Sequence, residues 1–293
     1  MARLYSPKEI KKIQDKYKFN TSKSLGQNFL IDGNVVRKIR EESNINENDT
    51  VLEVGPGLGT LTEELLMHAG KVIAIEIDKT LIPILKENFK DYNNFKLIND
   101  DVLKVDLEEL LKDEESIKVV ANLPYYVTSP IISLFIESNL DIDLMTFMVQ
   151  KEVADRMVAG PGSKIYGSLS VFIQFYSDPR ILMDVSRKSF MPSPNVDSAV
   201  VYMKKKNFKD IYSDLIIENL DFFFSLVHAA FNQRRKTILN SMSSNQKYNI
   251  KKDDLRRVFD KLSIDPRLRA EDLFVNDYIN ISQELLKEEI LWM

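Results

Sequence analysis

The stretch Glu53-Val54-Gly55-Pro56-Gly57-Leu58-Gly59-Thr60 decides the fold of this 293-residue chain. It follows a strand-forming run, Thr50–Val54, and precedes apolar residues at helical spacing, Leu61–Ala69. Three glycines within five residues let the backbone turn sharply and approach a bound cofactor closely. The stretch therefore predicts a strand–turn–helix unit that binds a cofactor at its turn.

Short strand-forming runs alternate with helical patterns across residues 50–150. The runs are Thr50–Val54, Val72–Ile77, Phe95–Ile98, Ile117–Ala121 and Leu144–Val149. Such alternation predicts an α/β fold, a Rossmann-like parallel sheet with helices on both faces. Two more strands are expected at Leu169–Tyr176 and Ser198–Met203.

The pattern becomes helical after Lys204-Lys205-Lys206. Helices are expected at 211–225, 229–242, 253–262, 270–275 and 278–291, and no glycine follows Gly167. We therefore predict a catalytic, cofactor-binding domain over residues 1–206 and a smaller all-α C-terminal domain over residues 207–293.

Two cofactors are compatible with the glycine-rich turn. A nicotinamide dinucleotide favours G-x-G-x-x-G, in which the helix N-terminus holds a pyrophosphate. The form present here is G-x-G-x-G, preceded by Glu53, which is typical of S-adenosylmethionine sites. Glu76 ends the second predicted strand, where a carboxylate can accept hydrogen bonds from both ribose hydroxyls. S-adenosylmethionine is favoured, and a nicotinamide oxidoreductase is the alternative.

Asp101 follows the third predicted strand. There it can accept a hydrogen bond from the amine of the cofactor's adenine. The alternative is an aspartate that caps a turn or helix.

The tetrapeptide Asn122-Leu123-Pro124-Tyr125 follows the fourth predicted strand, at the edge where open parallel sheets bind ligands. The exocyclic amine of a base is a poor nucleophile, because its lone pair is delocalised into the ring. The side-chain oxygen of Asn122 and the carbonyl of Leu123 can accept its two hydrogens. Pro124 stiffens the turn, and Tyr125 offers a ring on which a base can stack. These residues predict methylation of a base amine by positioning; an ordinary Asn-x-Pro turn is the alternative.

The composition excludes several other classes of site. The chain has no cysteine and only two histidines, His68 and His228, so disulfides, a bound metal and a Ser-His-Asp triad are not expected. No apolar run is long enough to span a membrane, and the lysine-rich beginning lacks the features of a secretory signal. We expect a cytoplasmic protein with no membrane partner.

Positive charge is concentrated in two segments, although the net charge is −4. Residues 1–40 hold ten Lys or Arg side chains and three acidic ones. Residues 232–252, which include Arg234, Arg235 and Lys236, hold six basic side chains and no acidic one. This asymmetry indicates a basic face for a polyanion; a solvated surface, or a helix surface packed on its neighbours, is the alternative.

Seven short motifs occur in a specific order. They are Ser24-Leu25-Gly26-Gln27-Asn28-Phe29-Leu30, Glu53 to Thr62, Glu76-Ile77-Asp78, Asp101-Val102-Leu103, Asn122-Leu123-Pro124-Tyr125, Phe190-Met191-Pro192-Ser193-Pro194-Asn195-Val196-Asp197-Ser198 and Ala230-Phe231-Asn232-Gln233-Arg234-Arg235-Lys236-Thr237. In this order and spacing, the set resembles the ribosomal RNA adenine N6,N6-dimethyltransferase family over nearly the whole chain.

The resemblance implies a Rossmann-like class I methyltransferase sheet, S-adenosylmethionine as methyl donor and S-adenosylhomocysteine as product. It implies four methyl transfers to N6 of two adjacent adenines in the 3′-terminal hairpin of small-subunit (16S) rRNA, during ribosome biogenesis. The partner would be the small ribosomal subunit or its precursor, and we expect the enzyme to be a monomer with an RNA-binding C-terminal domain.

The resemblance also implies roles for individual residues. The cofactor-binding residues would be Asn28, Leu30, Gly55, Gly57, Glu76 (ribose), Asp101 (adenine) and Asn122, which would also touch the target amine. Phe190 would stack on the flipped adenine opposite Tyr125, unless it is an aromatic residue of the core. Because Asp100 stands where the family commonly has a small residue, either Asp100 or Asp101 can be the adenine ligand.

Two related functions are further alternatives. A large-subunit rRNA adenine N6-methyltransferase of the macrolide-resistance type would share the whole cofactor and catalytic set. A ribosome assembly factor without catalysis would keep RNA binding alone. Ser24-Leu25-Gly26-Gln27 and Ala230–Thr237 favour the small-subunit type, and the intact tetrapeptide argues against loss of catalysis.

Overall fold

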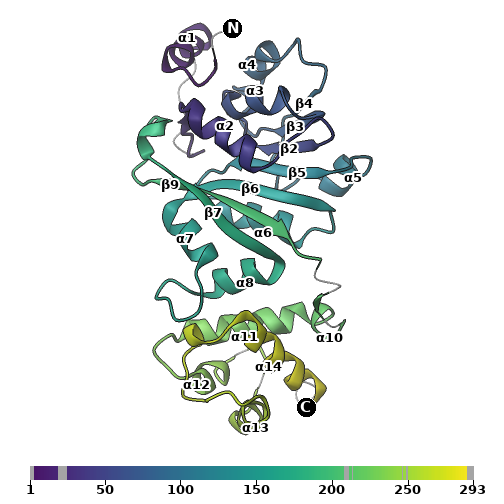
Figure 1. Ribbon diagram of the computed structural model, residues 1–293, viewed down its shortest axis with the longest axis vertical. Helices are drawn as coiled ribbons and strands as arrows, with labels where there is room; N and C mark the ends of the chain where they lie inside the picture. The colour runs from purple at the N-terminus through teal and green to yellow at the C-terminus, as the bar shows by residue number, and fades with distance from the viewer. Residues whose placement is uncertain are drawn as a thin grey trace. The chain divides into compact units, whose positions relative to one another are not determined.

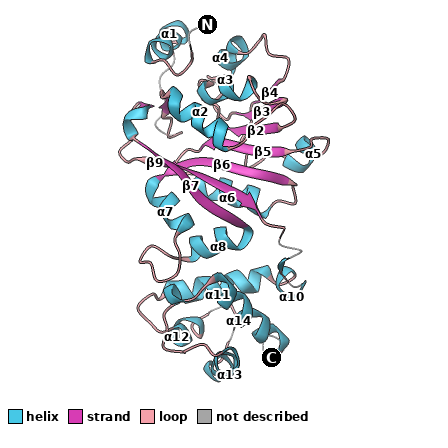
Figure 2. Cartoon of the chain, in the orientation of Figure 1, coloured by secondary structure: helices cyan, strands magenta, loops and turns pink. Residues whose placement is uncertain are grey.

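The computed structural model describes residues 3–18, 25–207, 211–212, 214–245, 247–248 and 250–288. The chain divides into two compact units (Figure 1). The first unit comprises Met1–Ala154 and Pro179–Lys205, and the second comprises Asp155–Asp178 and Lys206–Met293. The strands gather in the first unit, whereas the second is mainly helical (Figure 2).

The first unit contains a seven-stranded sheet in the order β4-β3-β2-β5-β6-β9-β7. The strands are β2 (Thr50–Val54), β3 (Lys71–Ile75), β4 (Phe95–Ile98), β5 (Ile117–Asn122), β6 (Ile142–Gln150), β7 (Ser177–Val185) and β9 (Ser198–Lys205). Strands β4, β3, β2, β5 and β6 run parallel, and β9 pairs antiparallel with β6. The order reverses between β2 and β5, which is where ligands bind in open α/β sheets.

Helices cover both faces of this sheet, as the alternating pattern predicts. The helices of the unit are α1 (Pro7–Tyr17), α2 (Gly33–Glu42), α3 (Thr60–Leu66), α4 (Ile82–Asn88), α5 (Leu107–Leu111), α6 (Thr128–Glu137) and α7 (Lys151–Val158), the last reaching into the second unit. Apolar residues of α2, α3 and α4 form one buried cluster with Val51, Val72 and Val120 of the sheet. On the other face, Phe135 of α6 packs against Phe147 of β6, with ring centroids 6.2 Å apart. The α/β prediction is confirmed.

A separate two-stranded ribbon joins the motif at residues 24–30 to the motif at residues 190–198. Strand β1 (Phe29–Leu30) pairs antiparallel with β8 (Phe190–Met191), which follows the 3₁₀ turn η1 (Arg187–Ser189). Phe29 and Leu30 are both buried. This ribbon fixes the position of the segment that precedes α2.

The second unit is built from α8 (Ser168–Tyr176), α10 (Asp214–Ile217), α11 (Leu220–Asn232), α12 (Ile238–Met242), α13 (Lys252–Leu262), η2 (Ala270–Asp272) and α14 (Val275–Lys287). The predicted boundary near residue 206 coincides with one border of this unit, but Asp155–Asp178 belong to it as well. The reason is aromatic packing: Phe175 of α8 lies 4.8 Å from Phe223 of α11, centroid to centroid.

Residues Leu169–Tyr176 form the helix α8, so their prediction as a strand is wrong. Their β-branched and aromatic residues favour strands in isolation, but tertiary packing overrides that preference. The side chain of Ser170 accepts a hydrogen bond from the backbone N–H of Gly167 at 3.1 Å, which caps the first turn. Phe172 and Tyr176, one turn apart, make an edge-to-face contact.

Candidate active site

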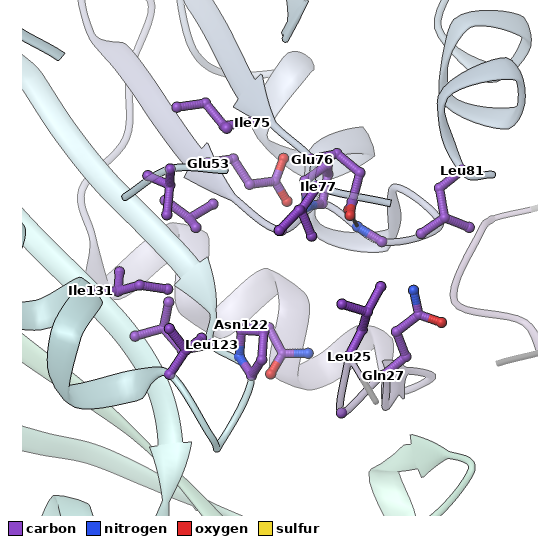
Figure 3. Close-up of a pocket in the computed structure, with 18 of the residues that line it drawn as sticks. Leu25, Gln27, Glu53, Ile75, Glu76, Ile77, Leu81, Asn122, Leu123 and Ile131 are labelled. Atoms are coloured by element: carbon purple, nitrogen blue, oxygen red, sulfur yellow. Dashed lines mark hydrogen bonds between the residues drawn. The ribbon is translucent and has the colours of Figure 1, made fainter. Parts of the chain in front are cut away.

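A cavity of about 400 Å³ opens at the carboxyl ends of the parallel strands, next to the point where the strand order reverses (Figure 3). The lining consists of residues 25–30, 53–58, 60–61, 75–77, 81, 100–103, 122–127 and 131. Glu53 and Glu76 lie along one side in Figure 3, and Asn122 and Leu123 lie along the opposite side. A cavity of this size suits a small-molecule ligand.

Glu76 follows directly after β3 and is only 4% exposed. Its Oε2 accepts a hydrogen bond from the backbone N–H of Gly57 at 3.1 Å, and its Oε1 accepts one from Asp78 at 2.8 Å. Burial raises its pKa to about 7 against the lowering effect of these two bonds. Each oxygen keeps further acceptor capacity, so the carboxylate can still bind a diol.

Glu53 lies on β2 at the same side of the cavity and is 1% exposed. Within the described part of the chain, its Oε2 has no hydrogen-bond partner. Burial raises its pKa to about 8, and the neighbouring Glu76 carboxylate adds to that rise. A buried carboxyl oxygen without a partner indicates a donor that a ligand supplies.

Gly55 provides a place where a ligand can lie directly on the backbone. Its φ is +68°, which favours glycine, and a Cβ built there would meet no atom within 4 Å. Two apolar side chains, Ile77 and Leu103, are 46% and 40% exposed and also line the cavity. Carboxyl acceptors, open backbone and apolar faces together fit S-adenosylmethionine, with its ribose, its amino-acid part and its purine.

Asp101 lines the cavity and also caps a turn. Its Oδ1 accepts a hydrogen bond from the backbone N–H of Leu103 at 3.1 Å, and its Oδ2 lies 3.9 Å from the Nζ of Lys104. Asp100 lines the same cavity and accepts from the N–H of Asp101 at 2.8 Å. The turn-capping interpretation is thus compatible with a ligand role for either carboxylate.

Asn122 is the last residue of β5, and its side chain has a defined orientation. Its Nδ2 donates a hydrogen bond to the backbone carbonyl of Asn28 at 3.2 Å. Since the amide nitrogen is directed at Asn28, the oxygen is the atom of this side chain that can accept a hydrogen from a substrate. Leu123, which follows, is held by a bond from its N–H to the carbonyl of Met148 at 3.1 Å.

Tyr125 is fixed at the far end of its ring. Its hydroxyl forms a 2.7 Å hydrogen bond with the Oγ of Ser198, at the start of β9, and burial raises its pKa. The next residue, Tyr126, is 59% exposed at the cavity rim. The structure thus brings Asn28, Leu30, Gly55, Gly57, Glu76, Asp101 and the whole tetrapeptide Asn122–Tyr125 to one cavity.

Phe190 does not line this cavity. The residue is 3% exposed, pairs with Leu30 across the ribbon of β1 and β8, and belongs to the apolar core. Stacking of its ring on a flipped adenine stays a prediction. The alternative, a core aromatic residue, agrees with the observed packing.

Arg234, Arg235 and Lys236 lie in the turn between α11 and α12, and not on a helix. The guanidinium of Arg234 donates to the carbonyls of Lys164 and Tyr166 at 2.8 and 3.1 Å and pairs with Glu271 at 2.9 Å. Arg235 and Lys236 are exposed. All three basic side chains are exposed, and Arg234 in addition holds loops of the second unit together.

Sequence reasoning gave no role to Glu53, Gln27, Ile77 or Leu103, although each lies within a quoted motif. Among the described residues, no group of three or more His, Asp or Glu side chains is placed to hold a metal ion. No helix in the described ranges is long and apolar enough to cross a membrane.

Comparison with known proteins identifies the family. Residues 18–287 match the family model for ribosomal RNA adenine dimethylase. The chain belongs to the ribosomal RNA adenine dimethylase family. A ribosomal RNA small subunit methyltransferase A from Alkaliphilus oremlandii is 47% identical over 293 residues, covering 98% of this chain and 100% of the relative. One from Clostridioides difficile is 45% identical, covering 96% of each chain.

Two solved structures of methyl-transferring enzymes agree with the fold. The dimethyladenosine transferase from Plasmodium falciparum superposes with a TM-score of 0.76 at 28% identity, over 90% of this chain and all of the other. The 23S rRNA methyltransferase ErmE superposes with a TM-score of 0.65 at 25% identity, over 91% of this chain and all of the other. The class I methyltransferase fold is confirmed, and the protein is a methyltransferase of the ribosomal RNA adenine dimethylase family.

Proposed function

We propose that this enzyme transfers methyl groups from S-adenosylmethionine to N6 of two adjacent adenines in the 3′-terminal hairpin of 16S rRNA. The product is N6,N6-dimethyladenosine in the small ribosomal subunit or its precursor, formed by a monomer in the cytoplasm. The observation that carries this proposal is one cavity in which Glu53 and Glu76 face the tetrapeptide Asn122–Tyr125. Relatives of the same length, named small-subunit methyltransferases, support the choice of RNA.

The side of the cavity with the carboxylates would hold the cofactor. Glu76 would accept the ribose hydroxyls, and Asp101 or Asp100 would accept the adenine amine between the apolar side chains of Ile77 and Leu103. The backbone at Gly55 and Gly57, with Asn28 and Leu30, would surround the remainder of the cofactor. When bound, S-adenosylmethionine supplies a methyl group made electrophilic by the sulfonium charge.

The tetrapeptide would position the target amine. The Asn122 side-chain oxygen and the Leu123 carbonyl would accept its two hydrogens, which favours a pyramidal nitrogen with an available lone pair. Tyr125, anchored by Ser198, would stack on the base. The new bond forms from nitrogen to the methyl carbon as the carbon–sulfur bond breaks, and the amine then releases a proton to solvent. Catalysis would be mostly positioning, since no strong base is required.

The second unit would bind RNA through three neighbouring loops, at 160–166, 233–237 and 265–271. Backbone bonds join them: Gly162 N–H to the Glu271 carbonyl at 2.7 Å, and Ile238 N–H to the Leu268 carbonyl at 2.6 Å. The exposed basic side chains on these loops are Lys164, Arg234, Arg235, Lys236, Arg267 and Arg269. Such a surface suits a phosphate backbone.

Mass spectrometry of 16S rRNA from cells with and without the protein tests this proposal. We expect N6,N6-dimethyladenosine at two adjacent positions only when the protein is present. Purified protein should also transfer labelled methyl groups to unmethylated small subunits. Methylation of 23S rRNA instead would support the large-subunit alternative, and cofactor binding without transfer would support an assembly factor.

A further inference from the structure

The segment Leu25–Leu30 crosses the cavity between the two groups of functional residues. All six of its residues line the cavity. Gln27 contacts the loop after β3, which holds Glu76, and Asn28 contacts Asn122 at the end of β5. The segment therefore touches both the proposed ribose site and the proposed catalytic amide.

On the ribose side, the link is a hydrogen bond from the Nε2 of Gln27 to the Oδ2 of Asp78 at 2.6 Å. The other oxygen of Asp78 accepts from the backbone N–H and the hydroxyl of Thr80, at 2.9 and 2.6 Å. Partial burial opposes ionisation, but the bonds from Thr80 and Gln27 hold the pKa of Asp78 below its ordinary value. The acceptor is thus ionised at neutral pH, and the bond is charge-assisted.

Asp78 is itself joined to Glu76. Its backbone N–H donates to the Oε1 of Glu76 at 2.8 Å. A shift of this loop would therefore alter both the Gln27 contact and the carboxylate that would bind the ribose.

On the catalytic side, the segment is seated on the loop that follows β5. The carbonyl of Asn28 accepts from Asn122 at 3.2 Å, and the Asn28 side chain donates to the carbonyl of Gly26 at 3.0 Å. Gly26 has φ of +60°, and a Cβ there would lie 3.4 Å from the ring of Tyr126. A glycine at this position lets the segment lie close to that ring.

The two ends of the segment are held differently. Phe29 and Leu30 are fixed by pairing with β8, and Ile31 donates to the carbonyl of Ser189 at 2.8 Å. At the other end, the bond from Gln27 to Asp78 is the charge-assisted contact. Loss of this bond would weaken the hold on residues 25–28 while leaving the ribbon intact.

We propose that Gln27 is a positioning residue of this enzyme. Its hydrogen bond to Asp78 holds residues 25–28 across the cavity, which slows cofactor release and keeps the Asn28 carbonyl on the Nδ2 of Asn122. The oxygen of Asn122 then stays directed at the target amine. This inference rests on the proposed function for its catalytic part, and on the cavity alone for its binding part.

The test is Gln27→Glu, which replaces the donor by a carboxylate of the same shape opposite Asp78. Above about pH 7, two ionised groups would repel where a bond to a charged group existed. We expect the dissociation rate of S-adenosylhomocysteine to rise on the order of tenfold and kcat to fall by a similar factor. In the cofactor-free protein, hydrogen exchange of the amides of residues 25–28 should accelerate, while that of the β8 ribbon should not.

A second substitution provides the rescue. Asp78→Asn in the Gln27→Glu background places an amide donor opposite the introduced carboxylate, so the bond can re-form in reverse. Dissociation rate, kcat and exchange should all return to within about threefold of wild type. Thr80→Ala is the matched control, because it removes a hydrogen bond to the same carboxylate without touching the segment, and it should leave all three unchanged.

Wild-type dissociation and exchange in Gln27→Glu would overturn the inference, as would a double variant no better than the single one. An equal effect of Thr80→Ala would also overturn it, since the Asp78 loop alone would then be responsible. Failure of the wild-type protein to methylate small subunits would contradict the proposed function instead, because the dissociation and exchange measurements need no RNA.

Discussion

Two buried carboxyl groups lie at opposite ends of strand β2, and their surroundings differ. Asp49, just before the strand, pairs with buried Lys118 at 2.7 Å and accepts further bonds from Asn46 at 2.7 Å and Ser116 at 2.9 Å. Glu53, near the other end, has an oxygen with no partner in the described residues and a pKa raised to about 8. Both oxygens of Asp49 thus have hydrogen-bond partners, whereas one oxygen of Glu53 has none in the described residues.

The difference separates structural chemistry from functional chemistry. Burying a charge is costly unless it is paired and hydrogen-bonded, and Asp49 meets both conditions. Glu53 keeps one oxygen without a partner in the described residues, and it lines a cavity. An incompletely satisfied buried group of this kind is retained where a ligand completes it. The carboxyl group at the amino end of β2 therefore stabilises the sheet, and the one at its carboxyl end is open to a ligand.

The largest effect is expected on stability, from removing the carboxyl group that pairs with Lys118 at the amino end of β2. Asp49→Ala would leave Lys118 buried without its counter-charge, and we expect a loss of about 3–5 kcal/mol in the free energy of unfolding. Urea denaturation measures it. Asp143→Ala is the control, because Asp143 is bonded to the same Ser116 but is exposed, and it should cost less than about 0.5 kcal/mol. Equal effects would remove the distinction between the two ends.

The next largest effect is expected on kcat, from a change at Asn122. Asn122→Ala removes the acceptor proposed for the target amine, and kcat should fall on the order of 100-fold. The dissociation constant for S-adenosylhomocysteine, measured by calorimetry, should change by less than about threefold. Asn122→Asp keeps an acceptor oxygen and should retain more activity. Unchanged methylation in Asn122→Ala would refute the role of this amide.

The sequence predicted most of the residues that line the cavity, because they belong to contiguous motifs at the carboxyl ends of the strands. Gly55, Glu76 and the tetrapeptide Asn122–Tyr125 reach the cavity directly from their positions in the sheet. What the sequence did not predict depends on contacts over long separations. The bond from Gln27 to Asp78 joins residues 51 positions apart, and no local pattern specifies it.

Other features that the sequence did not predict also depend on contacts over long separations. Phe190 pairs with Leu30, far earlier in the chain, and this pairing buries it. Strand β7 was not predicted because it lies at the edge of the sheet and contains Asp178, Pro179 and Arg180, which are uncommon in central strands. Helix α8 resembles a strand until its aromatic residues are placed against α11.

A smaller effect is expected in the pH dependence of stability, to which Glu53 contributes. The pKa of Glu53 in the folded protein lies above its ordinary value, so folding favours the protonated form. The associated stability is present at low pH and is lost as pH rises through about 8. The melting temperature of the cofactor-free protein should therefore fall more steeply between about pH 5 and pH 8 in wild type than in Glu53→Gln. Parallel curves would show that Glu53 is already satisfied.

The smallest effect is expected in the second unit, where Arg234 is paired with Glu271. Arg235 and Lys236 are exposed as well, and no ion pair is recorded for them among the described residues. Arg235→Ala with Lys236→Ala should weaken RNA binding and reduce the slope of log Kd against log salt by about 1–2. Their effect on stability should be within about 0.5 kcal/mol. Arg234→Ala should instead lower the melting temperature. An unaltered salt slope would place the RNA on another surface.

A crystal structure of the protein with S-adenosylhomocysteine would test the proposed site most directly. We expect the ribose on the carboxylate of Glu76, the sulfur beside Asn122, and space for a purine between that sulfur and the ring of Tyr125. A ligand bound elsewhere, or an Asn122 amide turned away from the sulfur with no room for a base, would contradict it.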